Sequence, residues 1–85
     1  MAVTEEINEP IDVLTSFHNG AIRPLKFKWA GRTYNVARIT YRWITREGAH
    51  QIRHFSVVAD TEETYEITLN THNLNWTLLK VHLAG

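Results

Sequence analysis

The stretch KFKWAGRTYNV, residues 26–36, decides the fold. Polar and apolar residues alternate on both sides of Ala30–Gly31, with Phe27 and Trp29 before this pair and Tyr34 after it. Alternation with a period of two is typical of half-buried strands. A two-residue connection that contains glycine favours a tight hairpin turn, because glycine tolerates positive φ. The stretch therefore predicts two antiparallel strands joined by a turn at residues 30–31.

The same alternation continues on both sides of this hairpin. Further apolar-polar runs cover residues 11–17, 25–29, 33–46, 50–59, 65–69 and 76–83. Between them, segments rich in Gly, Asn, Asp and Thr predict loops or turns at residues 18–24, 47–49, 60–64 and 70–73. No amphipathic run with a helical period of 3.6 interrupts the pattern. The fold class predicted is all-β, an antiparallel meander of about six strands.

Three of the runs change phase part of the way along, which indicates a curled sheet. In residues 33–46 the apolar positions shift from even numbers to odd numbers near Ala37–Arg38, and similar shifts occur in residues 50–59 and 76–83. A bulge is needed to keep the apolar side inward after such a shift, and bulges are typical of sheets that turn a corner. The meander is therefore expected to roll into a small barrel or a two-layer roll.

This phase assignment predicts which side chains face the core. On the strand before the hairpin turn, Leu25, Phe27 and Trp29 are expected to point inward. Phe17 is expected on the inward face of residues 11–17. On the long run after the turn, the inward positions are expected to be Ile39, Tyr41 and Trp43, and the outward positions Arg38, Arg42 and Arg46.

Length and composition indicate one domain. The chain has 85 residues, enough for one small core, and no cysteine to cross-link it. Residues 1–10 are polar and acidic and are interpreted as a flexible leader, with a single all-β domain over residues 11–85. The first residues lack the pattern of a signal peptide, and no apolar run is long enough to span a bilayer, so a cytoplasmic location without membrane contact is expected.

The opening stretch also carries a resemblance to known proteins. Phe27, Trp29, Gly31, Arg32 and Tyr34, followed by Val36, Ile39 and Trp43, resemble the core pattern F-x-W-x-G-R-x-Y-x-V-x-x-I…W. This is the pattern of an uncharacterised family of small bacterial domains. The segments NEPIDV (8–13), TYEITLN (64–70) and NWTLLKV (75–81) extend the resemblance over most of residues 8–83. It implies an all-β cytoplasmic domain, some of whose relatives lie near genes for error-prone polymerase-like proteins.

The charges of the chain are segregated, although they sum to zero. Eight of the nine Lys and Arg residues lie between Arg23 and Arg53, an interval with one acid, Glu47. The other acids flank this interval and could neutralise it within the molecule. The candidate contact residues for nucleic acid or another partner are Lys26, Lys28, Arg38, Arg42, Arg46 and Arg53. Small barrels bind single strands by combining such cations with exposed aromatic rings.

Three functions compete on this pattern. The leading hypothesis is a non-enzymatic interaction module with an unknown protein partner, accessory to DNA repair or replication proteins, because the predicted alternation places the rings inside. The alternative is direct binding of single-stranded nucleic acid by the basic strand face. A third is a weak homodimer through an exposed edge strand such as TLLKVHL, residues 77–83.

Catalytic and metal chemistry find no support in the sequence. Neither serine lies in a nucleophile motif, the four glycines form no phosphate loop, and the acids suggest no catalytic pair. The five histidines are scattered without the spacing of a ligand set. We therefore expect no enzyme activity, no cofactor and no metal site.

Overall fold

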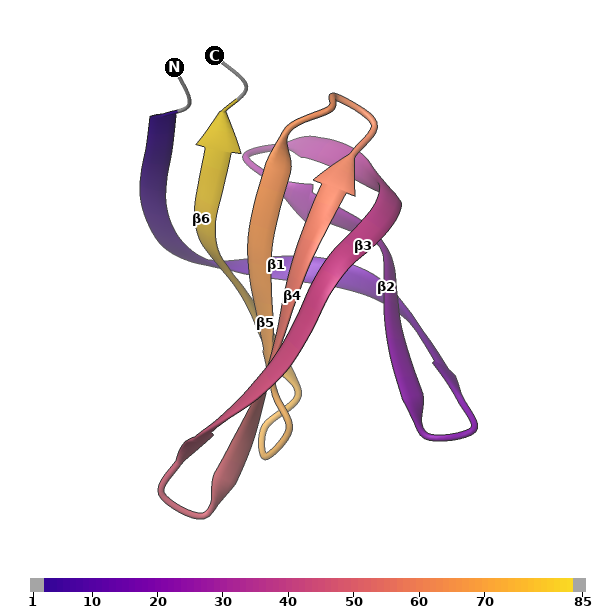
Figure 1. Cartoon of the computed structure of the whole chain (residues 1–85), viewed down its shortest axis with the longest axis vertical. Helices are drawn as coiled ribbons and strands as arrows, with labels where there is room; N and C mark the ends of the chain where they lie inside the picture. Colours follow the sequence, from indigo (N-terminus) through magenta and orange to yellow (C-terminus); the bar gives the residue numbers. More distant parts are fainter. Residues whose placement is uncertain (1–2, 84–85) are drawn as a thin grey trace.

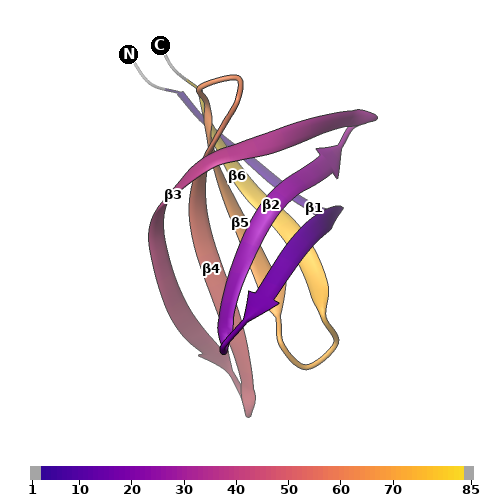
Figure 2. The ribbon, with the colours of Figure 1, turned by 90° about the vertical axis from the view of Figure 1, so that its right-hand side faces the viewer.

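A computed structural model describes residues 3–83 of the chain, all of them in strands or the connections between strands. The six strands are β1 (Val3–His18), β2 (Ala21–Trp29), β3 (Arg32–Glu47), β4 (His50–Ala59), β5 (Thr64–Asn70) and β6 (Asn75–Leu83). Each strand pairs antiparallel with the next, and β1 also pairs with β6, so the sheet closes into a barrel (Figures 1 and 2). The predicted fold class is confirmed.

The hairpin turns show why the strands begin and end where they do. Ala30 and Gly31 both have positive φ, 54° and 76°, and they connect β2 to β3 as expected. Asn19 and Gly20 repeat this geometry, with φ of 49° and 79°. Positive φ at two consecutive residues matches the right-handed twist of the flanking strands. The loop expected over residues 18–24 is therefore wrong, because a two-residue turn suffices there and β2 begins at Ala21.

The segment expected to be a flexible leader is also different. Residues 3–10 form the first half of β1 and pair with β6, from Val3 opposite Leu83 to Pro10 opposite Thr77. The acidic composition that suggested a leader is compatible with this strand, since most of its side chains are exposed. The pairing partner lies at the other end of the chain, where local composition cannot reveal it. Residues 1 and 2 lie outside the described part.

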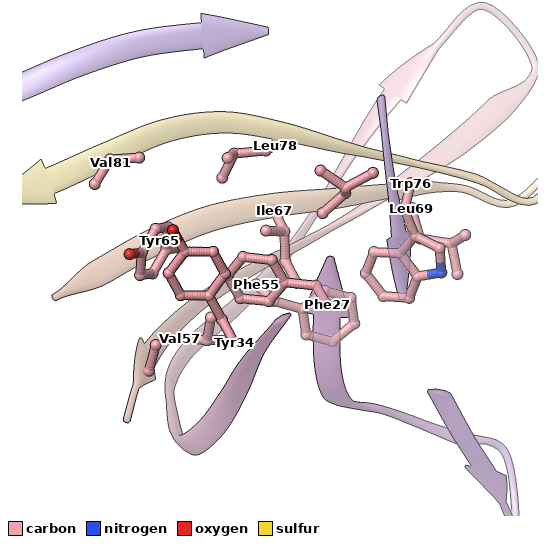
Figure 3. Close-up of a cluster of buried hydrophobic side chains, with 12 residues drawn as sticks. Phe27, Tyr34, Phe55, Val57, Tyr65, Ile67, Leu69, Trp76, Leu78 and Val81 are labelled. Atoms are coloured by element: carbon pink, nitrogen blue, oxygen red, sulfur yellow. The ribbon is translucent and has the colours of Figure 1, made fainter. Parts of the chain in front are cut away.

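The core is a cluster of aromatic and aliphatic side chains inside the barrel (Figure 3). Phe27 is 1% exposed and stacks on Tyr34, with ring centroids 5.1 Å apart and planes inclined by 16°. The edge of Tyr65 packs on the same Phe27 ring at 5.1 Å. Ile67 and Leu78 are fully buried beside them. Aromatic pairs in these geometries add to the stabilisation that burial alone provides.

Two bulges in β3 change the face that its later side chains occupy. Val36 lies opposite Ala59 and Arg38 opposite Val58, so Ala37 has no partner on β4. This first bulge is the one that the phase change predicted. A second leaves Thr40 without a partner, and its hydroxyl donates a hydrogen bond to the carbonyl of Ser56 at 3.1 Å.

The second bulge overturns the face assignment for the end of β3. Arg42 lies opposite the buried Phe55, so Arg42 points to the interior side of the sheet, and the rings of Tyr41 and Trp43 point outward. Tyr41 is 72% exposed. The expected inward Tyr41 and Trp43, and the expected outward Arg42, are therefore wrong, because two one-residue insertions shift the phase twice.

Other bulges correct or confirm the remaining phase predictions. Leu14 of β1 pairs with Lys26 of β2, and the next residue, Thr15, pairs with Pro24. Leu25 is therefore an extra residue in β2, and its side chain is exposed instead of inward. In β6, Leu79 is extra between Leu78 and Lys80, as its phase change predicted. In β4 the pairing with β5 runs without a shift, so the bulge expected within residues 50–59 is absent from that pairing.

Candidate nucleic-acid interface

The barrel opens where the pairing of β2 with β3 stops. Their register covers only Lys26–Trp29 of β2 and Arg32–Asn35 of β3, and from Val36 onward β3 pairs with β4 alone. The two edges separate and leave a cavity of about 700 Å³ between them. It is lined by residues 23–25 of β2 and residues 36–42 of β3. Three arginines border this space: Arg23, Arg38 and Arg42.

A second cavity shares Arg42 with the first and lies toward the tips of two hairpins. The β1–β2 and β3–β4 hairpins both end at the lower side of Figure 1. A cavity of about 460 Å³ is lined by Gly20–Ile22 of the first hairpin, and by residues 42–44 and 53–55 of the second. Arg42 lines both cavities. We call the combined space the inter-hairpin groove.

The structure brings together some of the six candidate residues and separates others. Arg38, Arg42 and Arg53 line the inter-hairpin groove. Arg46 lies on the same face of β3 as Arg42, closer to the hairpin tip, opposite Gln51. Its expected outward orientation is wrong for the same reason as that of Arg42.

The two candidate lysines lie apart from the groove. Lys28 pairs with Asp12 of β1, and Lys26 with Leu14. Both lysines alternate with the buried Phe27, so they occupy the outer face of β2, as predicted. Neither contributes to the lining of the inter-hairpin groove. Of the six candidates, the groove therefore contains arginines of β3 and β4 but neither lysine.

Arg23 is a groove residue that the sequence did not single out. Its positive charge was evident, but the segment around it was expected to be a loop. The Asn19–Gly20 pair was the signal available for a tighter turn, since Asn-Gly is the preferred pair for two-residue hairpins. With β2 beginning at Ala21, Arg23 lies on the edge strand, where it faces β3 across the opening.

The acidic flanks do not pair with the groove arginines. Within residues 3–83 the ion pair found within 4.0 Å is Lys80–Glu66, at 3.9 Å. Asp60 accepts a hydrogen bond from the side-chain amide of Asn35 at 3.0 Å, and Glu9 accepts one from the indole of Trp29 at 3.3 Å. These acids are engaged elsewhere on the barrel. The groove arginines therefore remain available to an external anion.

Exposed aromatic rings lie around the groove. Tyr41 and Trp43 are on β3, which is the edge strand at this point, so side chains on both of its faces border the opening. Phe17 is on the facing hairpin and is 65% exposed. It pairs with Ile22, which lines the second cavity. Large exposed apolar side chains gathered at one place mark a binding surface.

Polar atoms beside the second cavity lack partners. The Nε atom of Arg53 and the Nδ1 atom of His54 are buried without a hydrogen bond. Buried polar atoms without partners are uncommon in folded proteins, and each needs an explanation. Burial lowers the pKa of His54, an effect that the negative charge of Glu66 opposes. His54 is therefore biased toward its neutral form.

The histidines form one close pair. The rings of His50 and His72 have centroids 3.9 Å apart and join the start of β4 to the β5–β6 connection. In the part of the chain that the structure describes, no three His, Cys, Asp or Glu residues gather as metal ligands.

Comparisons with protein-family models, with curated proteins and with solved structures find no match for this chain. No helix in residues 3–83 has the length and apolar character needed to cross a membrane. The fold and the groove thus define the candidate function by themselves: a small six-stranded barrel with a basic, aromatic-rimmed opening.

Proposed function

We propose that this domain binds single-stranded nucleic acid in the inter-hairpin groove. The observation that carries the proposal is the set of groove arginines without an acidic partner, next to exposed aromatic rings. Arginine binds phosphate through charge-assisted, bidentate hydrogen bonds. Exposed rings provide surfaces on which bases stack. Both elements of single-strand recognition therefore lie along the edge of β3 that borders the groove, on its two faces.

The geometry favours a single strand over a duplex. The arginines lie in a groove between two strand edges and two hairpins, where a flexible chain can enter. Rings can stack only on bases that are not already stacked on both faces, which is the state of bases in a single strand. A role beside DNA repair or replication proteins is consistent with this proposal and with the resemblance in residues 8–83.

The competing functions use different features. A protein partner with an acidic extended segment would engage the same arginines, so the test below includes one. Self-association through the C-terminal strand has no support, because β6 pairs with β5 on one side and β1 on the other. Within the described residues the open edges include those of β2 and β3 at the groove, and β1 is also open along residues 12–18, which pair with β2 alone.

Binding of a labelled oligothymidylate, about nine nucleotides long, tests the proposal. Fluorescence anisotropy at several salt concentrations gives the dissociation constant and its salt dependence. We expect binding that weakens steeply with salt, since each phosphate contact releases condensed counterions. Arg42→Gln should reduce the slope of log affinity against log salt concentration by the amount that corresponds to about one phosphate contact, because Arg42 lines both cavities.

Lys28→Gln is the matched control. It removes the same charge from the outer face of β2, away from the groove, and should leave the slope unchanged. Equal losses from Lys28→Gln and Arg42→Gln would contradict a groove site. A labelled polyglutamate peptide that binds when the oligonucleotide does not bind would favour the protein-partner function instead.

A further inference from the structure

We propose that the cavity between the hairpin tips takes one unstacked guanine of the bound strand, read by the side chain of Arg53. This inference rests on the proposed function and names the base that its groove selects. It assigns separate roles to the two parts of the inter-hairpin groove. The larger cavity follows the phosphates, and the smaller one receives a base.

The walls of the smaller cavity suit a flat aromatic ring. Ile22 comes from the β1–β2 hairpin, and Ile44 and Phe55 come from the β3–β4 hairpin. The volume of about 460 Å³ lies between these two hairpins, so a ring that enters has apolar groups on both sides. Base pockets in proteins hold an extruded base between apolar or aromatic side chains in this way.

Arg53 supplies the polar group that orients the base. It lies opposite Ile44, on the same face of β4 as Phe55, and so faces the cavity. Its Nε atom is buried with no hydrogen-bond acceptor in the structure. Because guanidinium carries donors only, the missing partner must be an acceptor. Because this atom is covered in the free protein, a bound base reaches it only when the Arg53 side chain turns into the cavity, and its acceptor then satisfies a donor that folding leaves unpaired.

Guanine fits this donor better than adenine or thymine, and its two-ring system fills more of the cavity than cytosine, whose O2 and N3 are also neighbouring acceptors in a single strand. Guanine presents two neighbouring acceptors, O6 and N7, that match the paired N–H groups of arginine, and this is the commonest specific contact between arginine and a base. Adenine places an amino donor beside N7, and thymine offers O4 beside a methyl group. Arg42 then connects the base to the backbone, since it lines both cavities and can hold the adjoining phosphate.

Four labelled nine-nucleotide strands test the inference, each oligothymidylate except for a central dG, dA, dC or dT. Anisotropy at one low salt concentration gives the four dissociation constants. We expect the dG strand to bind about tenfold more tightly than the dT strand. Equal affinity for all four, or preference for another base, would overturn the guanine pocket while leaving single-strand binding intact. Absence of binding by every strand would overturn both proposals.

Substitutions show which residue distinguishes guanine from the other bases. Arg53→Lys keeps the charge but removes the planar pair of donors, so it should bring the four affinities within about twofold of one another. Arg38→Lys is the control, because Arg38 lines the larger cavity but not the smaller one, and it should keep the preference for dG. If Arg53→Lys keeps the full preference, Arg53 is not the reader. The comparison of the four strands needs no variant, so it decides the base preference even if Arg53→Lys folds poorly.

A spectroscopic readout separates a direct contact from an indirect effect. The Nε–H resonance of Arg53 should shift on addition of the dG strand and move less with the dT strand, because the donor gains an acceptor only in the first complex. An unchanged resonance at saturating dG strand would contradict the contact.

Discussion

Trp43 stacks on His54, with ring centroids 5.0 Å apart and ring planes inclined by 14°. The two residues lie directly opposite each other on β3 and β4, on the outer face of the sheet. His54 is further held by a hydrogen bond of 2.7 Å between its Nε2 atom and the hydroxyl of Thr45. The pair therefore fixes the orientation of Trp43 at the rim of the inter-hairpin groove before any ligand arrives.

The lowered pKa of His54 predicts a pH-dependent stability. Burial holds the pKa in the folded state below the ordinary value of 6.5. As the pH falls through 6.5, the unfolded chain takes up a proton at His54 before the folded chain does, so the free energy of unfolding decreases. The contribution of His54 to the free energy of unfolding changes only between its unfolded-state pKa of 6.5 and its lower folded-state pKa, and it is constant at higher and at lower pH. Urea denaturation between pH 7.5 and pH 5 measures it, and His54→Gln should reduce the dependence. An unchanged dependence in His54→Gln would assign it to other groups.

In the turn between β2 and β3, two substitutions are expected to change the stability of the fold in opposite directions. Gly31 has a φ of 76°, and a methyl group there would meet no other atom within 4 Å, so Gly31→Ala should destabilise by backbone strain alone, about 1–2 kcal/mol. Ala30 has a φ of 54° without being glycine, and Ala30→Asn creates the preferred Asn-Gly pair. Urea midpoints should fall for the first variant and rise for the second. Movement in the same direction would contradict the turn geometry.

Because of the bulge at Leu25, alanine substitutions at the nearby apolar residues Phe27 and Leu25 should reduce the stability of the fold by different amounts. Phe27 is 1% exposed among the aromatic rings of the core, so Phe27→Ala should cost about 3–5 kcal/mol or prevent folding. Phe27→Leu provides a milder variant whose stability can still be measured. Leu25→Ala should change stability by about 0.5 kcal/mol or less, because Leu25 lies outside the core. A large loss from Leu25→Ala would restore the inward position that alternation alone predicts.

We expect the exposed ring of Phe17 to provide the contribution of the β1–β2 hairpin to binding. It shares the interior side of the sheet with Ile22, whereas Leu14 pairs with Lys26 on the outer side. Both side chains are exposed, so neither substitution should affect stability strongly. Phe17→Ala should weaken oligothymidylate binding by about 1–3 kcal/mol through loss of stacking, and Leu14→Ala should leave it unchanged. Equal effects of the two variants would remove this hairpin from the site.

The sequence predicted the fold class because alternation, turn residues and phase changes are local signals. The bulge near Ala37 was visible as a shift from even to odd apolar positions, and the structure confirms it. The bulge at Thr40 was not visible, because Tyr41 and Trp43 are apolar enough to look like core residues while lying outside. Alternation identifies the two faces of a strand but cannot tell whether the aromatic-bearing face is the buried one when the strand extends beyond the barrel.

The candidate site was predictable only in part for a related reason. Arg38, Arg42 and Arg53 were selected by charge and strand position, and the groove contains them. Lys26 and Lys28 satisfied the same criteria but lie on another face, because the groove depends on where the pairing of β2 with β3 ends. That end point is set by the three-dimensional curvature of the sheet. Composition also could not show that Glu66 pairs with Lys80, since these two residues meet only across strands.

The pairing of β1 with β6 has a consequence for how the protein folds. Val3 lies opposite Leu83, so the ring closes only when the two ends of the described chain meet. Contacts between residues so far apart in sequence raise the contact order, which slows folding to the millisecond-to-second range typical of small all-β domains. The hairpins, whose contacts are local, can form before the ring closes. We therefore expect substitutions in the β1–β6 ladder to accelerate unfolding more than they slow folding.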